Sequence, residues 1–395
     1  MHPAEAVDDG VTEPASVESG TSASWDRADA EAIGIWLLTR LAVAVIVSTA
    51  AWNLSSQPFS PPFPQLGSFV DRFAQWDFVH YQAIAQTWYD GQPTGVPLEA
   101  FFPGFPASMW ALNIFGIPYV VGGLLVSLVA GGIAMVALRR LGDLEFGPGV
   151  GARSVVLITL APVAIFLAAP YTEALFLGFA VPAWLAARRG RWPLAAVLAC
   201  GAGTVRVNGI FLALALIVEY VTSKRRDGWR EAPWLVVSFA GSATYLLYLW
   251  RRTGDPLRWL HAESEGWARG FNTPWVTLEH TWNAAFTRTD FNANYTWMER
   301  AELVATLVGA LLTIALLVWR RWGEAAWVGL QVAALGTSYW YFSVPRATLL
   351  WWPLWIGLAV LTLRYRWLFW LYLAICVPLM VVWVTAFTLG GHWTG

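Results

Sequence analysis

Charged residues are scarce in this 395-residue sequence: they make up 13% of it, against about 25% in soluble domains. Hydrophobic residues reach 57%, and the mean hydropathy is +0.50. This composition excludes a soluble globular protein and predicts an all-α protein that crosses a membrane many times. The net charge of −1 gives no basic surface, so nucleic acid is not an expected partner.

Lysine, cysteine and paired histidines are also nearly absent. Lys224 is the only lysine among the 25 Lys and Arg residues, a bias typical of GC-rich bacteria. Cys200 and Cys376 lie in apolar runs without metal-ligand spacing, which favours packed, unreactive thiols. The histidines are scattered, so we expect no metal site and no cofactor; an Asp/Glu metal site in the outer loops is the alternative that stays open.

No Gly-rich phosphate loop, nucleotide-binding βαβ pattern or internal repeat is recognisable. The first two absences disfavour a soluble enzyme that uses nucleotide sugars. The third gives little support to a transporter built from inverted repeats, although such symmetry can be invisible in a sequence.

The chain begins with an acidic segment rich in Ser, Ala and Pro. Residues 1–30 show no apolar periodicity, so we expect a disordered cytoplasmic tail ahead of a transmembrane domain at 31–395. In that domain, about eleven apolar runs are predicted to cross the bilayer as helices. We place them at 32–52, 117–138, 153–170, 171–187, 192–205, 207–222, 232–250, 300–319, 325–343, 348–363 and 367–389.

The fifth and sixth runs are short, and they meet at the polar sequence TVRVNG, residues 204–209. Such a break is tolerated at membrane depth only where protein or a water-filled cavity covers it. Eleven spans that start from a cytoplasmic N-terminus put every arginine-rich loop on the cytoplasmic side, as the positive-inside rule demands. These loops contain Arg139/Arg140/Arg153, Arg188/Arg189/Arg191, Lys224/Arg225/Arg226/Arg230, Arg320/Arg321 and Arg364/Arg366.

The same topology places the remaining polar features on the opposite, extracytoplasmic face. They are the outer loops 53–116 and 251–299, the Pro170-Tyr171 turn, Arg206 with Asn208, and Pro345-Arg346. The first outer loop holds the longest polar, aromatic-rich interruption near the start of the chain, residues 73–106, where we expect short helices.

Asp77 follows Trp76 in this interruption, and the run WDFVHYQAIAQTWYD has helical spacing. Asp77, His80 and Tyr81 stand at i, i+3 and i+4, so they share one face of a short helix. A carboxylate held there beside apolar rings is a candidate general base. The alternative is a solvated interfacial helix that the aspartate only caps.

Several motifs, in a fixed order, resemble the PIG-V family of membrane mannosyltransferases and together cover most of the membrane part. They are WDFVHYQAIAQTWYD (76–90), AFFPGFP (100–106), APYTEALF (169–176), RGRWPLA…GAGTVRVNG (189–209), RTGDPLRWLHAESEGW (252–267) and SVPRATLLWWPLW (343–355). The first two motifs each differ from the family pattern at one place. Trp88 replaces the usual glycine in the first motif, and Gly104-Phe105 replaces a Leu-Tyr pair in the second.

The resemblance implies a GT-C glycosyltransferase fold and an inverting hexosyl transfer, usually of mannose from a polyprenyl-phosphate donor. The acceptor would be a hydroxyl of a glycolipid, a glycan or a protein, on the extracytoplasmic or lumenal face. The acidic residue of the first outer loop acts as the base in such enzymes, and this role falls on Asp77. It also implies a multi-pass plasma membrane protein if the source is bacterial, or one of the endoplasmic reticulum if it is eukaryotic.

Seven further residues are expected to bind substrate: His80, Tyr81, Glu173, Arg206, Asn208, His261 and Arg346. Arg206, with Asn208 beside it, is predicted to bind the donor phosphate because a guanidinium matches phosphate oxygens; a snorkelling arginine is the alternative. Arg346 has either a phosphate-binding or a structural role.

Glu173 is expected to bind acceptor hydroxyls or to pair with Arg206. His261 and Glu263 of the second outer loop are expected near sugar hydroxyls or the leaving oxygen. Two other functions remain: a transporter or flippase of lipid-linked sugars, and a glycan polymerase or ligase. A transporter should carry its polar groups near midplane, whereas the groups here are predicted to lie at one face.

Overall fold

The computed structural model describes residues 25–54, 69–91, 94–223, 229–288 and 293–391. Every regular element among these residues is a helix and none is a strand, which confirms the all-α prediction. Residues 1–24 of the predicted tail lie outside the described residues, as do Lys224, Arg225 and Arg226. The first helix begins at Arg27, within the last residues of the predicted tail.

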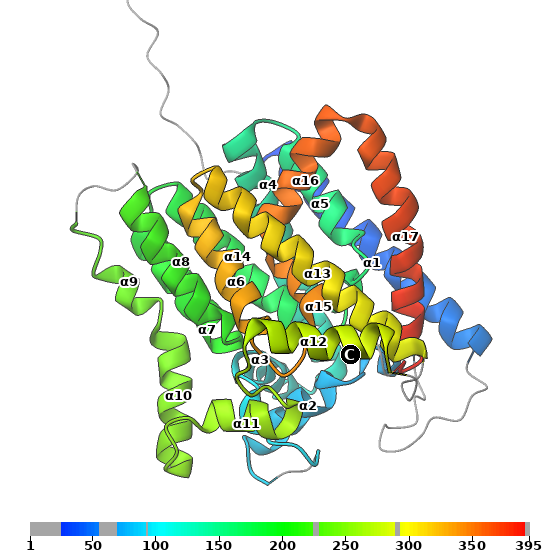
Figure 1. Ribbon diagram of the computed structural model, residues 1–395, viewed down its shortest axis with the longest axis vertical. Coiled ribbons are helices and arrows are strands. Elements are labelled where there is room, and N and C mark those ends of the chain that lie inside the picture. Colours follow the sequence, from blue (N-terminus) through cyan, green and yellow to red (C-terminus); the bar gives the residue numbers. More distant parts are fainter. Residues whose placement is uncertain (1–24, 55–68, 92–93, 224–228, 289–292, 392–395) are drawn as a thin grey trace, which may run out of the picture.

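The longer helices form a bundle of tilted rods, and several shorter ones gather at one end of it (Figure 1). The bundle helices are α1 (Arg27–Leu54), α4 (Tyr119–Phe146), α5 (Val150–Thr159), α6 (Thr172–Arg188), α7 (Trp192–Val205), α8 (Asn208–Thr222), α10 (Ala240–Thr253), α13 (Ala293–Val318), α14 (Trp322–Leu335), α16 (Trp352–Arg364) and α17 (Arg366–Thr388). The shorter elements are η1 (Val70–Phe73), α2 (Asp77–Thr87), η2 (Leu98–Ala100), α3 (Gly104–Asn113), η3 (Ala164–Leu167), α9 (Trp234–Val237), α11 (Arg258–Trp267), α12 (Pro274–Phe286), α15 (Val344–Ala347) and η4 (Thr348–Leu350).

Four described helices are long and apolar enough to cross a membrane: α1, α4, α13 and α17. The bent pair formed by Val344–Leu350 and Trp352–Arg364, with 76° between its halves, is a fifth candidate. The helices α5, α7 and α8 are apolar but shorter. The structure is therefore that of a polytopic membrane protein, while the number of about eleven spans stays a prediction.

Four predicted spans are not continuous helices. The run 348–363 is divided between η4 and α16 at the 76° bend. The run 153–170 is interrupted because Pro162 lacks an N–H and clashes with the preceding turn, so α5 ends at Thr159. The run 232–250 is divided between α9 and α10, and the run 325–343 is helical only to the end of α14, where a glycine follows. The predicted break at 204–209 is confirmed, since α7 ends just before Arg206 and α8 begins just after it.

Two glycines allow close approach of backbone segments at this break. A Cβ atom at Gly209 would lie 2.3 Å from the Cα atom of Gly203, so α8 touches α7 directly beside Arg206. A Cβ atom at Gly104 would lie 2.7 Å from the carbonyl oxygen of Thr204. The AFFPGFP and TVRVNG segments, far apart in the sequence, therefore meet here, and the departure at Gly104 suits this contact.

One end of the bundle is crossed by ion pairs that join α1, α4, α6, α8 and α14. These pairs are Arg139–Asp26, Arg139–Asp29, Arg140–Asp29, Arg188–Glu145, Arg188–Glu219, Arg321–Glu145 and Arg321–Glu324. The arginines belong to the loops that the positive-inside rule assigns to the cytoplasm. At the opposite end lie α2, α3, α11 and α12, and α10 extends beyond the other bundle helices on that side (Figure 1). The side of the membrane on which each end lies stays a prediction.

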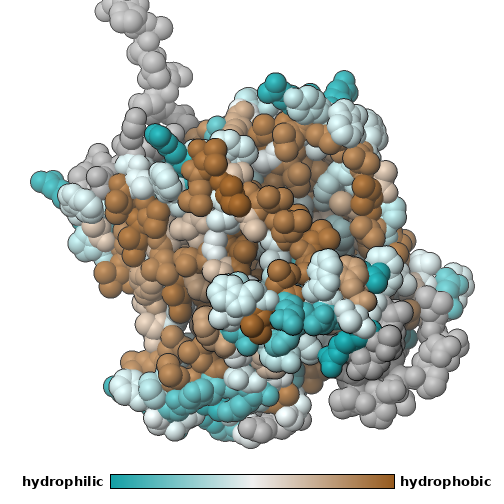
Figure 2. Space-filling view, in the orientation of Figure 1, coloured by the Kyte–Doolittle hydropathy of each residue, from teal (hydrophilic) through white to brown (hydrophobic). Residues whose placement is uncertain are grey.

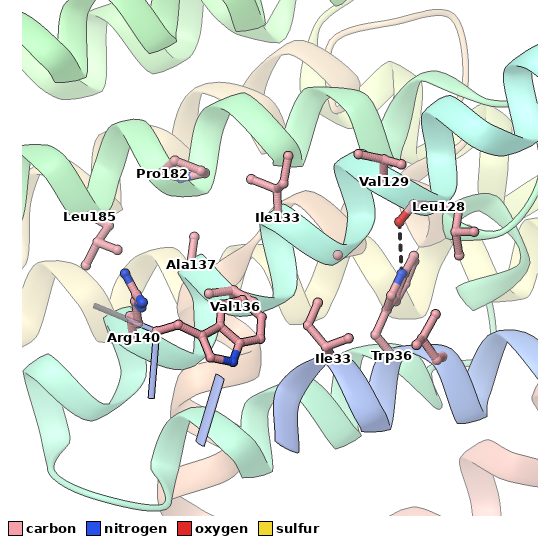
Figure 3. Close-up of a pocket in the computed structure, with 13 residues that line it drawn as sticks. Ile33, Trp36, Leu128, Val129, Ile133, Val136, Ala137, Arg140, Pro182 and Leu185 are labelled. Carbon is pink, nitrogen blue, oxygen red and sulfur yellow. Dashed lines mark hydrogen bonds between the residues drawn. The ribbon is translucent and has the colours of Figure 1, made fainter. Parts of the chain in front are cut away.

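The surface agrees with this division. Figure 2 shows a broad apolar band across the bundle, with polar residues at both ends and over α10 to α12. Within the apolar part, a hollow of about 500 Å³ opens between α1, α4 and α6 (Figure 3). Trp36 donates a hydrogen bond to the carbonyl oxygen of Leu128 there, at 3.0 Å, and Arg140 is the only charged residue among the described residues that line it. The residues that line this hollow include none of the candidate site residues.

Candidate functional site

Asp77 is the first residue of α2, and the turn before it is unusual. Trp76 has a φ of +51°, a conformation that costs a non-glycine residue about 1–3 kcal/mol. The Tyr171 hydroxyl donates a hydrogen bond of 2.8 Å to the carbonyl oxygen of Gln75 and holds this turn in place. The helix itself follows the predicted spacing, and its N-terminal dipole favours the negative charge of Asp77.

Two arginines and two carboxylates from four elements meet at this point. Arg346 of α15 donates from Nη1 to Oδ2 of Asp77 at 2.6 Å and from Nε to Oε1 of Glu173. Arg206, at the break between α7 and α8, donates from Nη1 to the same Glu173 oxygen at 2.6 Å. We call Asp77, Glu173, Arg206 and Arg346 the charge cluster. Its formal charges sum to zero.

The charge cluster is largely removed from water. Glu173 is fully buried, and the Arg346 side chain is 9% exposed. Asp77 and Arg206 are more open, with 20% and 23% of their side chains exposed. The Oε2 atom of Glu173 has no hydrogen-bond partner in the described structure, so the buried carboxylate retains an acceptor site for a ligand.

Two aromatic rings hold Arg346, and a threonine holds Arg206. The Arg346 guanidinium lies 4.7 Å from the ring centroid of Tyr171 and 5.0 Å from that of Phe166, at cation–π distance. Thr172, at the start of α6, accepts a hydrogen bond from Arg206. The APYTEALF motif therefore contributes Tyr171, Thr172 and Glu173 to one place, because it begins a helix at the bundle end.

The electrostatics keep Asp77 ionised. Burial raises the pKa of Asp77, but the charge and hydrogen bond of Arg346, together with smaller contributions from neighbours such as Arg206, outweigh burial and hold the pKa below its ordinary value of 3.8. Burial lowers the pKa of His80 against the opposing effect of Asp77, so the imidazole is neutral at pH 7. An ionised carboxylate with a neutral imidazole one turn away is able to accept a proton from a hydroxyl.

The other α2 candidates lie beside the charge cluster without joining its ion pairs. His80 stacks on Phe101, with ring centroids 4.9 Å apart, and Trp267 of α11 meets the His80 ring edge-on at 5.8 Å. Tyr81 is buried, and its hydroxyl lies 3.5 Å from the Thr172 hydroxyl. The first outer loop and α11 thus form an aromatic wall next to Asp77.

Arg206 and Asn208 are half-buried and hydrogen-bonded to other residues of the protein. Arg206 has extended backbone angles, φ −151° and ψ 153°, which end α7. Its Nε donates to the Asn208 side-chain oxygen at 3.4 Å, and Asn208 donates to the buried Gln331 side chain at 3.1 Å. The Arg206 side chain therefore pairs within the protein, with Glu173, rather than snorkelling past a helix end.

His261 does not join the charge cluster. Its ring is 54% exposed, and Nδ1 lies 2.6 Å from Oδ2 of Asp255. Glu263, two residues further along α11, is instead 13% exposed and lies 3.3 Å from Arg269. Positions two apart on a helix face different sides, so the two side chains do not share one place, and sugar binding by His261 stays a prediction. Burial, opposed in part by Arg269, raises the pKa of Glu263.

Sequence reasoning missed two buried residues that support the cluster. Gln331 anchors Asn208, and Glu302 accepts hydrogen bonds from the backbone just before Arg346. Both are polar residues within apolar runs, and this signal could have identified them. Among the described residues, no group of three or more His, Cys, Asp or Glu side chains could hold a metal ion.

Part of the chain is similar to two characterised enzymes. It is 31% identical over 174 residues to GPI alpha-1,6-mannosyltransferase 2 of Homo sapiens, covering 39% of this chain and 34% of that protein. The Cricetulus griseus protein of the same name gives 31% identity over 172 residues, with 38% and 34% coverage. The similarity supports a mannosyltransferase-like protein. The match spans about a third of the length of these curated relatives. No family model matches the chain.

Proposed function

We propose that this protein is a GT-C type inverting glycosyltransferase that moves mannose, or a related hexose, from a polyprenyl-phosphate donor to an acceptor hydroxyl. The observation that carries the proposal is the charge cluster. It places a carboxylate at the start of a short helix beside two arginines, at the end of the bundle opposite the arginine-rich loops. The similarity to mannosyltransferases supports the same reaction.

The reaction needs a base and cations that can bind the leaving phosphate, and the cluster contains a carboxylate at Asp77 and two guanidinium groups. As the acceptor oxygen attacks the anomeric carbon, its proton passes to Asp77. The bond between that carbon and the phosphate oxygen breaks on the opposite side, and the electron pair leaves with the polyprenyl phosphate. The phosphate thereby gains negative charge, and Arg206 and Arg346 are placed to stabilise it in the transition state.

Donor binding would also activate the base. Arg346 is bound to Asp77 and Glu173, so a donor phosphate competes with two carboxylates for its guanidinium. Each hydrogen bond that Arg346 transfers to phosphate removes a stabilising contact from the Asp77 carboxylate and makes it more basic. In this scheme Asp77 becomes a stronger base only when donor is present.

The remaining parts of the proposal concern the place and the partners. We assign the charge cluster to the extracytoplasmic face, because the arginine-rich loops at the other end follow the positive-inside rule. The acceptor is proposed to be a hydroxyl of a membrane glycolipid, since the named relatives act on GPI. The aromatic wall of Phe101 and Trp267 is suited to pack against a sugar ring.

The test is transfer by purified protein in liposomes that contain polyprenyl-phosphate mannose labelled in the sugar, with bacterial lipid extract as acceptor. The proposal predicts a labelled product together with release of unlabelled polyprenyl phosphate. Movement of intact donor between leaflets without cleavage would instead establish the transporter alternative.

A further inference from the structure

Arg346 lies in a very short helix, α15, which follows an irregular segment of the chain. The helix α14 ends at Leu335, and α15, which carries Arg346, is only four residues long. Between them runs an irregular segment, residues 336–343, whose backbone N–H and C=O groups need partners from elsewhere. The position of the guanidinium therefore depends on what holds this segment.

The helix α12 holds the first half of the segment. The Thr277 hydroxyl donates to the carbonyl oxygen of Ser338 at 2.5 Å. The backbone N–H of Tyr341 donates to the Thr281 hydroxyl at 2.9 Å. Both threonines are fully buried and lie one turn apart on the inner face of α12.

Glu302 of α13 holds the second half. Its Oε1 accepts the N–H of Ser343 and its Oε2 accepts the N–H of Val344, both at 2.8 Å. The residue is 2% exposed and lies in an apolar spanning helix, where an ionisable side chain is rare without a partner or a function. Ser343 has a φ of +63°, so these two bonds hold a turn in the left-handed region.

The turn directly precedes the arginine of the charge cluster. Pro345 follows Val344 and has no backbone N–H. The N–H groups of Ser343 and Val344 are therefore the last two backbone donors before Arg346. A carboxylate with two oxygens satisfies both donors at once, which a single hydroxyl or amide oxygen cannot do with the same geometry. The two bonds fix the direction in which α15 starts.

We propose that Glu302 is a positioning residue for Arg346: its carboxylate clamps the Ser343–Val344 turn so that the guanidinium is aimed at Asp77 and at the donor phosphate. The effect on catalysis rests on the proposed function, through phosphate binding by Arg346. The clamp itself does not, and it can be measured separately.

The experiment compares Glu302→Gln with Glu299→Gln. The amide in Glu302→Gln would keep one acceptor and turn an NH₂ donor toward the other N–H, whereas Glu299 lies one turn earlier, is equally buried, and contacts neither donor. Hydrogen exchange of peptides that contain Ser343 and Val344 reports the clamp, and donor KM and kcat report its consequence.

We expect Glu302→Gln to speed exchange of this turn and to raise the donor KM or lower kcat by about tenfold or more, with an unfolding midpoint close to that of Glu299→Gln. Glu299→Gln should retain wild-type exchange and kinetics. Unchanged exchange in Glu302→Gln overturns the clamp. Faster exchange with wild-type kinetics overturns the positioning role. If the wild type transfers no sugar, the proposed function fails, while the exchange result still decides the clamp.

Discussion

Arg346 determines the chemical state of the charge cluster. It binds both carboxylates, and it lies on two aromatic rings with little exposure to water. Buried ion pairs contribute little net stability, but removing one partner leaves an uncompensated buried charge. The pairing also sets the proton affinity of Asp77, and therefore the pH range in which Asp77 can act as a base.

Arg346→Gln should destabilise the protein by about 3 kcal/mol or more, since Asp77 and Glu173 lose their shared partner. It should also raise the pKa of Asp77, because burial would then be opposed only by weaker partners such as Arg206. We therefore expect the acid limb of the kcat/KM–pH profile, which reports the free enzyme, to move to higher pH. Arg252→Gln, which removes an exposed pair with Asp90, is the matched control and should change neither quantity.

The direction of the stability change follows from the same pKa. The folded-state pKa of Asp77 lies below its unfolded value, so ionised Asp77 stabilises the fold above the unfolded pKa, and this contribution is lost as pH falls through the folded pKa. In the wild type the loss should begin only below about pH 4. An unfolding midpoint of Arg346→Gln with the same acid dependence as the wild type would contradict this assignment.

Among the elements, α12 joins an exposed apolar stripe to the segment that precedes Arg346. Its buried face carries the two threonines that hold residues 338–341, and its exposed face carries a stripe at i, i+3, i+7 and i+11: Trp275, Leu278, Trp282 and Phe286. The helix lies across the ends of the bundle helices and precedes the spanning part of α13 (Figure 1). Such a helix, with tryptophans on one face, suits the lipid–water interface.

A spin label at Trp282→Cys, in a Cys200→Ser, Cys376→Ser background, should be more accessible to oxygen than to a water-soluble nickel chelate in liposomes. Glu265→Cys on the exposed side of α11 is the control and should show the opposite preference. If the label at residue 282 prefers the nickel chelate, α12 lies in water and not in the interface.

The elements that carry helical spacing were predictable. The shared face of Asp77, His80 and Tyr81 on α2 and the break at Arg206 follow from the local sequence. Helix periodicity and a polar interruption can both be recognised from residues that are close together in the chain. The short helix α15 and its clamp were not, since Glu302 and Ser343 meet only through the packing of α13 on α15. The distance of His261 from the charge cluster was not predictable either, because a motif fixes sequence distance and not the direction in which each side chain of α11 points.

The two ends of the helix bundle carry different sets of polar residues. Arginines bound to carboxylates close one end, and the charge cluster, the aromatic wall and α12 lie at the other. This arrangement matches an enzyme that works at one membrane face better than a transporter, which needs polar groups along its path. The sequence predicted the division from arginine counting alone, and it predicted that the runs 192–205 and 207–222 are short, but not that α5 ends at Thr159.

Accessibility to a membrane-impermeant maleimide tests the orientation. In the cysteine-free background, Glu265→Cys should be labelled in right-side-out vesicles and Arg364→Cys only after the membrane is opened. Both positions are exposed in the structure. The reverse labelling pattern would place the charge cluster on the cytoplasmic side and contradict the proposed topology.

The most direct test of the account is the turnover of Asp77→Asn in the liposome transfer assay, with donor binding measured on the same preparation. Asparagine keeps the shape of the side chain but cannot take the acceptor proton. We predict a fall in kcat of about a hundredfold or more, with donor bound as tightly as in the wild type or more tightly, because Arg346 is freed from one carboxylate. Wild-type kcat in Asp77→Asn would contradict the assignment of Asp77 as the base.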